Sequence, residues 1–81
     1  MLLEVLYFAS LRDRAGTARE SVDVDPGLTV TDLWDLLVRR HPALAEVAPR
    51  PAAACDLVYS TWDRSLEGVR EVAFLPPMSG G

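Results

Sequence analysis

Residues 29–42, TVTDLWDLLVRRHP, contain the longest helical pattern in the chain and decide its fold. Apolar residues recur at the i, i+3, i+4, i+7, i+8 spacing of a helix packed on a core, namely at Val30, Leu33, Trp34, Leu37 and Val38. Thr29 or Thr31 can act as the N-cap, and Pro42 stops the helix. The stretch therefore predicts one long helix with a single buried face.

Four extended segments flank this helix. Residues 2–8 are densely apolar, residues 20–25 alternate valine with polar residues, and residues 52–59 and 69–75 complete the set of predicted strands. Residues 10–16 are expected to form a loop or a short helical turn, 43–48 a further short turn, and 61–68 a connection.

The order strand, strand, helix, strand, strand predicts one sheet that is covered on one face by one helix. The fold class is α+β, a β-grasp (ubiquitin-like) arrangement with a mixed sheet of four to five strands. Residues 1–75 would form this domain. The first and last strands are the most apolar, so we expect them side by side at the centre of the sheet.

Alternation along those two strands predicts an apolar strip on the face that the helix leaves open. Leu3, Val5 and Tyr7 point one way, whereas Leu6 and Phe8 share the side of Glu4. In the last strand, Ala73 and Leu75 point to one face of the sheet, and Val72 and Phe74 point to the other. The apolar strip would then contain Leu6, Phe8, Ala73 and Leu75, and such strips usually mark docking surfaces. The alternative is that residues 43–51 or neighbouring molecules cover it.

The chain ends in Pro76-Pro77-Met78-Ser79-Gly80-Gly81. Proline cannot donate to a sheet, so the last strand must stop and residues 76–81 are predicted to form an extended tail. Fully extended, this tail spans about 20 Å. Glycine lacks a Cβ, so such a tail could enter the active site of another protein. A frayed end without function is the alternative.

Composition excludes several classes of function. The chain has 81 residues, a net charge of −4 and one cysteine, so it is one domain without an internal disulfide and not a general nucleic-acid binder. No apolar run approaches a membrane span and no signal peptide is recognisable, so we expect a cytoplasmic protein. All eight basic residues are arginine, which GC-rich coding would explain. Without lysine, the chain cannot form lysine-linked polymers with itself.

The sequence offers no catalytic constellation within this chain. His41 is interpreted as a helix cap and Cys55, among alanines, as an inert core residue. One cysteine and one histidine cannot make a zinc site. Trp34 lies on the apolar stripe of the helix, whereas Trp62 lies in a connection and is expected to be partly exposed.

Both ends of the chain resemble a known family. Residues 5–12, VLYFASLR, with residues 15–17, AGT, and residues 71–81, EVAFLPPMSGG, are similar to the small subunit of molybdopterin synthase, the MoaD family. The resemblance covers the whole chain, although the helix between the two ends matches only in pattern.

The resemblance implies a carrier of sulfur rather than an enzyme acting alone. An E1-like adenylyltransferase would use ATP to adenylate Gly81, which would become a thiocarboxylate and donate its sulfur to the dithiolene of molybdopterin. Gly80 would be the residue that threads into the partner, and no cofactor is bound. Phe8, Arg12 and Leu75 would contact partners, together with the lead-in residues Pro76, Pro77, Met78 and Ser79. The implied partner is the large subunit, in a heterotetramer.

Two positions depart from the family pattern, and two other functions stay open. Arg70 stands where an acidic residue is usual after Glu67-Gly68-Val69, and Asp56 stands where asparagine is common. A related carrier for thiamine synthesis, tRNA thiolation or protein conjugation would share the same tail chemistry. A β-grasp interaction module with an inactive terminus is the third possibility.

Overall fold

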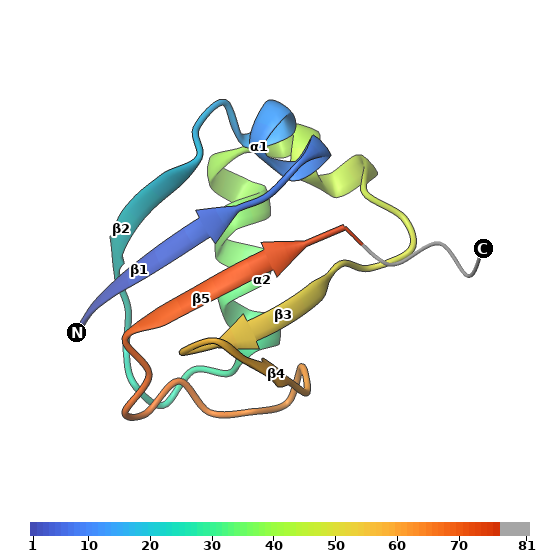
Figure 1. Cartoon of the computed structure of the whole chain (residues 1–81). Helices are drawn as coiled ribbons and strands as arrows, with labels where there is room; N and C mark the ends of the chain where they lie inside the picture. The colour runs from blue at the N-terminus through green and yellow to red at the C-terminus, as the bar shows by residue number, and fades with distance from the viewer. Residues whose placement is uncertain (77–81) are drawn as a thin grey trace.

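The computed structural model describes residues 1–76 of the chain. Its elements are β1 (Leu2–Tyr7), α1 (Ser10–Ala15), β2 (Arg19–Asp23), α2 (Val30–Arg40), a 3₁₀ helix η1 (Pro42–Glu46), β3 (Ala52–Cys55), β4 (Val58–Ser60) and β5 (Glu71–Leu75) (Figure 1). In this part of the chain, no helix has the length and apolarity that crossing a bilayer requires.

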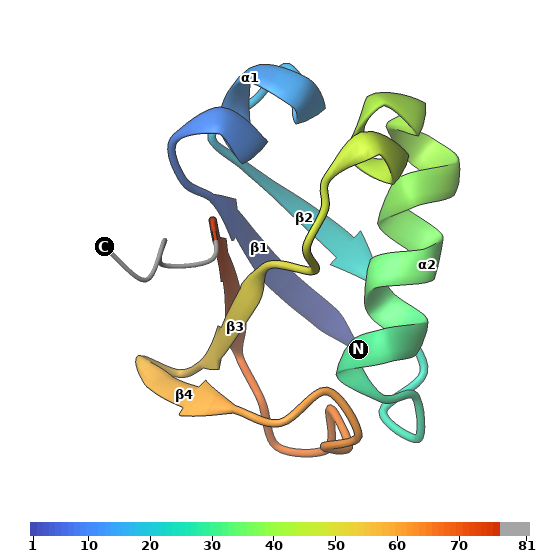
Figure 2. The ribbon, with the colours of Figure 1, turned by 90° about the vertical axis from the view of Figure 1, so that its right-hand side faces the viewer.

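The five strands form one mixed sheet in the order β2-β1-β5-β3-β4. β1 and β5 run parallel at its centre, with Val5 opposite Val72 and Leu6 opposite Ala73. α2 and η1 lie on one side of the sheet, and α1 lies beyond the end of β1 (Figure 2). The predicted β-grasp fold is confirmed, and so is the central position of the first and last strands.

The start of α2 is fixed by a capping box. The Thr29 side chain accepts a hydrogen bond from the Asp32 backbone N–H at 3.2 Å, and the Asp32 carboxylate accepts one from the Thr29 N–H at 3.0 Å. Thr31, the alternative cap, instead donates its hydroxyl to the Trp62 carbonyl at 2.9 Å. Two backbone donors at the helix start are thereby satisfied, and α2 is tied to the loop before β5.

The core lies between α2 and the sheet. Leu3, Val5 and Tyr7 are buried, as the alternation predicted. Trp34 contacts Phe74, with ring centroids 4.9 Å apart, so its predicted core role is confirmed. Trp62 is partly exposed, as expected, and the Arg50 guanidinium lies 4.2 Å from its ring centroid.

The prediction of one strand over residues 52–59 was wrong, because the chain reverses there in the tight β3–β4 hairpin. Asp56 and Leu57 take positive φ angles of 49° and 72°, which close a two-residue turn. The Asp56 carboxylate also accepts hydrogen bonds from the backbone N–H groups of Arg70 and Glu71, at 3.1 and 2.9 Å. The Asp56 carboxylate therefore supplies the acceptor that links this turn to the start of β5.

Leu57 is an unfavourable residue for its turn. Its side chain is 88% exposed, and a left-handed leucine costs about 1–2 kcal/mol of backbone energy. We expect Leu57→Gly to raise the free energy of unfolding by about 0.5–1 kcal/mol, because glycine adopts this conformation freely but loses more chain entropy. Urea denaturation measures the change.

Gly16→Ala is the matched control for that measurement. Gly16 ends α1 with a φ of 77°, and an added Cβ there meets no atom within 4 Å. Any change in stability therefore reports backbone conformation alone. We expect Gly16→Ala to lower the free energy of unfolding by about 1 kcal/mol. A Leu57→Gly variant that is less stable than the parent chain would show that the leucine side chain contributes more than its backbone strain costs.

Candidate functional site

The face of the sheet opposite to α2 carries two apolar rows. One row crosses four strands through Leu6, Ala73, Ala54 and Tyr59, which the strand registers place side by side. The other joins Phe8, Leu75 and Ala52: Ala52 is opposite Leu75, and the Phe8 N–H donates to the Phe74 carbonyl at 3.1 Å. The predicted members Leu6, Phe8, Ala73 and Leu75 are therefore neighbours on one face, and Ala52, Ala54 and Tyr59 extend this strip. Ala73 itself is buried, with 7% of its surface exposed.

Within residues 1–76, α2 and η1 lie away from this strip, whereas α1 begins two residues after Phe8. Phe8 is 46% exposed and Tyr59 is 72% exposed. Residues 43–51 were the segment that sequence reasoning allowed as a cover. Within this segment η1 packs against α1 and α2 on the other side of the sheet, and the Arg50 guanidinium lies over the Trp62 ring (Figure 2). The strip is thus an apolar surface of the described chain that is available to a partner.

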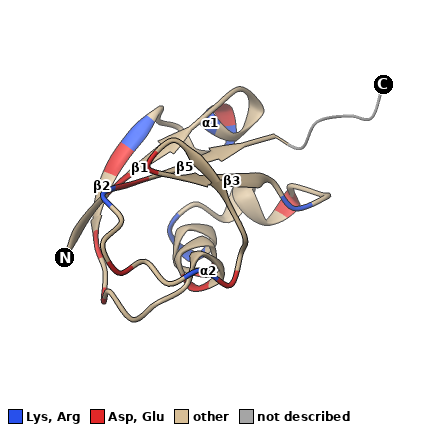
Figure 3. Cartoon of the chain, turned by 60° about the horizontal axis from the view of Figure 1, so that its bottom comes forward, with Lys and Arg blue, Asp and Glu red and all other residues tan. Residues whose placement is uncertain are grey.

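The opposite end of the same face is polar. The Glu4 carboxylate accepts hydrogen bonds from the Arg19 Nε at 2.7 Å and from the Ser21 hydroxyl at 2.9 Å. The bond from Arg19, followed by that from Ser21, lowers the pKa of Glu4. Charged side chains lie along β2, whereas β3 carries none (Figure 3). The apolar strip therefore lies toward the end of the sheet where β5 stops, although Leu2, at the other end of β1, is also exposed.

β5 stops at Leu75, and Pro76, which is partly buried, is the last described residue. Gly80, the predicted threading residue, and Gly81, the predicted reactive residue, lie outside the described residues, as do Pro77, Met78 and Ser79. The structure thus places Phe8 and Leu75 together beside the point from which the tail departs.

Arg12 is less directly connected to this surface. It is exposed on α1, where it lines a surface hollow with Asp13, Gly16 and Thr17. Tyr59, by contrast, is exposed on the open face, and sequence reasoning missed it. Its face depends on the Ala54–Tyr59 register, which follows from the β3–β4 hairpin and from no local sequence pattern.

Sequence reasoning also missed a charged cluster around Glu20. Its carboxylate accepts hydrogen bonds from the Tyr7 hydroxyl at 2.6 Å and from Arg40 at 2.8 Å, and His41 Nε2 lies 2.6 Å away. Burial alone would raise the pKa of Glu20, but the hydrogen bonds from Tyr7, Arg40 and His41 together lower it. Burial and the bond to Glu20 raise the pKa of Tyr7. The cluster joins the end of α2 to β1 and β2, so His41 does more than cap the helix.

This cluster predicts a dependence of stability on acid. Because the pKa of Glu20 is lower in the folded chain than its ordinary 4.5, its contribution is complete above pH 4.5 and is lost as the pH falls through the folded value. We expect Glu20→Gln to lower the free energy of unfolding by about 1.5–3 kcal/mol at neutral pH. The difference from the parent chain should shrink in acid, as measured by urea denaturation across pH.

Glu46→Gln is the matched control, because Glu46 pairs with Arg14 at 3.0 Å on the surface. Glu46→Gln should lower the free energy of unfolding by about 0–1 kcal/mol, and this difference should be nearly independent of pH. If the two variants showed the same pH profile, the Glu20 cluster would not be the source of the acid sensitivity.

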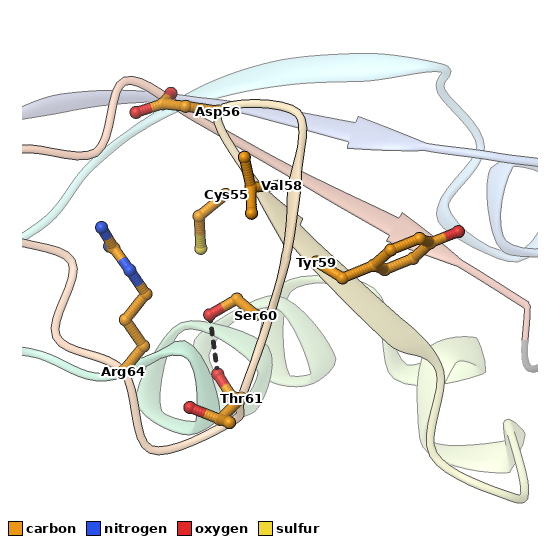
Figure 4. A pocket seen from close by; sticks show the side chains of 7 residues that line it. All are labelled: Cys55, Asp56, Val58, Tyr59, Ser60, Thr61 and Arg64. Carbon is orange, nitrogen blue, oxygen red and sulfur yellow. Dashed lines mark hydrogen bonds between the residues drawn. The ribbon is translucent and has the colours of Figure 1, made fainter.

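A hollow of about 450 Å³ lies beside β4. Figure 4 shows the Cys55 sulfur facing into it and the Tyr59 ring turned away. Cys55 is 5% exposed, which confirms its predicted position in the core. The Asp56 carboxylate on its rim is engaged by backbone N–H groups. The hollow thus presents one buried thiol and no catalytic constellation.

Comparison with known proteins identifies relatives along the whole chain. The model of the ThiS family matches residues 5–81. The molybdopterin synthase sulfur carrier subunit of Chlamydomonas reinhardtii is 35% identical, with 100% of both chains covered. The human protein of the same name is 33% identical, over 98% of this chain and 93% of its own.

Solved structures share the fold. A Pyrococcus furiosus protein described as molybdopterin converting factor subunit 1 superimposes with a TM-score of 0.84 at 27% identity, covering 96% of this chain and 99% of its own. Small archaeal modifier protein 1 of Haloferax volcanii gives 0.81 at 29%, covering 95% and 98%. A chain from the complex of subunits 1 and 2 of the Helicobacter pylori molybdopterin-converting factor gives 0.66 at 18%, covering 100% of both, a likeness of fold alone.

Proposed function

The chain belongs to the ThiS family, and on this premise we propose that it is the sulfur carrier subunit of a molybdopterin synthase. The observation that carries the proposal is the similarity over the full chain to relatives of that name, at 35% and 33% identity. The position of the apolar strip beside the end of β5 supports it, because a carrier must dock while its tail reaches elsewhere.

The proposed chemistry takes place at Gly81. An E1-like adenylyltransferase joins the Gly81 carboxylate to AMP from ATP and releases pyrophosphate. A sulfur nucleophile then bonds to the Gly81 carbonyl carbon, the bond from that carbon to the AMP oxygen breaks, and a thiocarboxylate remains. The thiocarboxylate donates its sulfur to the dithiolene of molybdopterin. This chain supplies a terminus and a docking face, while the catalytic groups belong to its partners.

The proposed partner is the large subunit of the synthase. A Helicobacter pylori protein of the same fold was solved as a complex of subunits 1 and 2 of a molybdopterin-converting factor. We propose that the apolar strip contacts this subunit, in a heterotetramer, while Pro76 directs residues 77–81 toward its active site. Pro76 supports this role because it cannot extend the β5 ladder.

Intact-mass spectrometry tests the function directly. After incubation with ATP, activating enzyme and a sulfur donor, we expect the chain to show the mass of one oxygen replaced by sulfur. Adding a large subunit and precursor should restore the original mass as molybdopterin forms. A chain that is adenylated but never gains sulfur would contradict the proposal.

Protein conjugation is the second candidate, because small archaeal modifier protein 1 matches at 29% identity with nearly complete coverage. The two functions differ in the acceptor. A modifier forms an amide with an amine of another protein, whereas a sulfur carrier is recovered unchanged in length and without an attached protein. Denaturing electrophoresis after activation in the presence of a cell extract separates these outcomes.

A further inference from the structure

The chain contains few nucleophiles that could attack its own activated end. All eight cationic side chains are arginine, so lysine amines are absent from the 81 residues. The strong nucleophiles that remain are the α-amino group of Met1 and the thiol of Cys55. Unactivated hydroxyls are weak nucleophiles at neutral pH. An acylated His41 imidazole would hydrolyse and leave no lasting adduct.

The α-amino group lies beyond the reach of the tail. β1 and β5 are parallel with Glu4 opposite Glu71, so Met1 is level with residue 68, eight residues behind Pro76. At 3.3 Å per residue, those eight residues correspond to about 26 Å along the sheet. Residues 77–81 span at most about 17–18 Å when extended. The amine also donates to the Asp23 carboxylate at 2.8 Å and to the Val24 carbonyl at 3.1 Å.

The thiol is within reach by length and faces the hollow beside β4, but little of it is exposed. Cys55 is opposite Val72, four residues behind Pro76, so about 13 Å separate their levels. Its side chain is 5% exposed and belongs to the core between the sheet and α2. Burial keeps it from an acyl carbon outside the core.

We infer that an activated Gly81 cannot be captured by its own chain, so that only a nucleophile from another molecule can consume it. The inference rests on the proposed function. The reaction avoided is attack by the Met1 nitrogen or the Cys55 sulfur on the Gly81 carbonyl carbon. That attack would expel AMP and a proton and close the chain into a ring. Parallel pairing of β1 with β5, burial of Cys55 and the absence of lysine together prevent this loss.

A C-terminal thioester of the chain, prepared by intein cleavage, tests the inference without any activating enzyme. The result is therefore independent of whether the proposed function is correct. The thioester is incubated at neutral pH and low micromolar concentration, and intact mass separates the hydrolysed linear chain from the ring, which is lighter by one water. We expect the parent chain to give the linear acid.

Two arginine-to-lysine variants supply the matched comparison. Arg19 is opposite Leu6, which is opposite Ala73, three residues behind Pro76 and two strands away. This places the Arg19 and Pro76 Cα atoms about 14 Å apart, within the tail's span. Arg64 lies beside the start of α2, where its carbonyl accepts from the Val30 N–H, at the end of the molecule opposite to where β5 stops (Figure 1).

We expect Arg19→Lys to give at least about tenfold more ring than Arg64→Lys. Only the amine at position 19 lies within reach of the tail, so only this amine has a high effective concentration at the thioester. A ring from the parent chain, or a thioester on Cys55 detected by peptide mapping, would overturn the inference. Equal amounts of ring from the two lysine variants would also overturn it, because distance would then not be what protects the terminus.

Discussion

Deleting Gly81 is expected to abolish sulfur transfer and to leave the folded domain intact. β5 ends at Leu75, so the deletion removes no residue from the sheet. Each extended residue spans about 3.3–3.6 Å, and a displacement of 1 Å in a reacting group can cost about a hundredfold in rate. The shortened terminus would stop short of both catalytic centres. We therefore expect at least a hundredfold loss of molybdopterin formation with purified large subunit, activating enzyme and sulfur donor.

Binding and stability separate this effect from general damage. The truncated chain should unfold at the same denaturant concentration as the parent, and should bind the large subunit through the apolar strip. If it retained a tenth or more of the parent activity, Gly81 would not be the residue that carries sulfur. If activity and binding were lost together, the tail would act in docking rather than in chemistry.

Features that depend on local pattern were predicted from the sequence. The stripe from Val30 to Val38 sets the buried face of α2, and Thr29 with Asp32 sets its start, because both depend on residues a few positions apart. Alternation likewise assigned the faces of β1 and β5. The β3–β4 hairpin was missed because its turn residues are Asp56 and Leu57 rather than a glycine-containing pair.

The remaining features depend on contacts between distant residues. Glu20 contacts Tyr7 and His41, which are 13 and 21 residues away in the sequence, and no local spacing predicts these contacts. Tyr59 joins the open face only through the hairpin register. The apolar strip could therefore be predicted at its centre, where two apolar strands pair, but not at its β4 edge.

The geometry also explains why docking and delivery can be separate tasks. Because β1 and β5 are parallel, Phe8 and Leu75 both lie at the end of the sheet where the tail departs, while the polar Glu4–Arg19 pair lies farther back. A partner on the strip would hold the chain beside the tail's origin. The reaction at Gly81 then depends on the length of the tail, whereas the affinity for the partner depends on the apolar strip.

That division predicts a large effect of a charge placed in the strip. Phe8→Asp is expected to weaken binding to the large subunit by about 2–4 kcal/mol, roughly 30- to 1000-fold in Kd, because a buried aromatic contact is lost and a carboxylate must be desolvated. Phe8 is already 46% exposed and follows the last residue of β1, so the fold should tolerate the change. Isothermal titration calorimetry measures the affinity.

Leu57→Asp is the control for Phe8→Asp. Leu57 is 88% exposed at the β3–β4 turn, and Cys55 opposite Val72 places that turn toward the start of β5 and away from the strip's tail end. The same charge there should change Kd by less than about threefold, the change expected of a residue outside the contact. Similar losses from the two variants would mean that the large subunit recognises net charge or the hairpin instead. An unchanged Kd for Phe8→Asp would remove the strip from the docking surface altogether, because Phe8 is its most exposed member beside the tail.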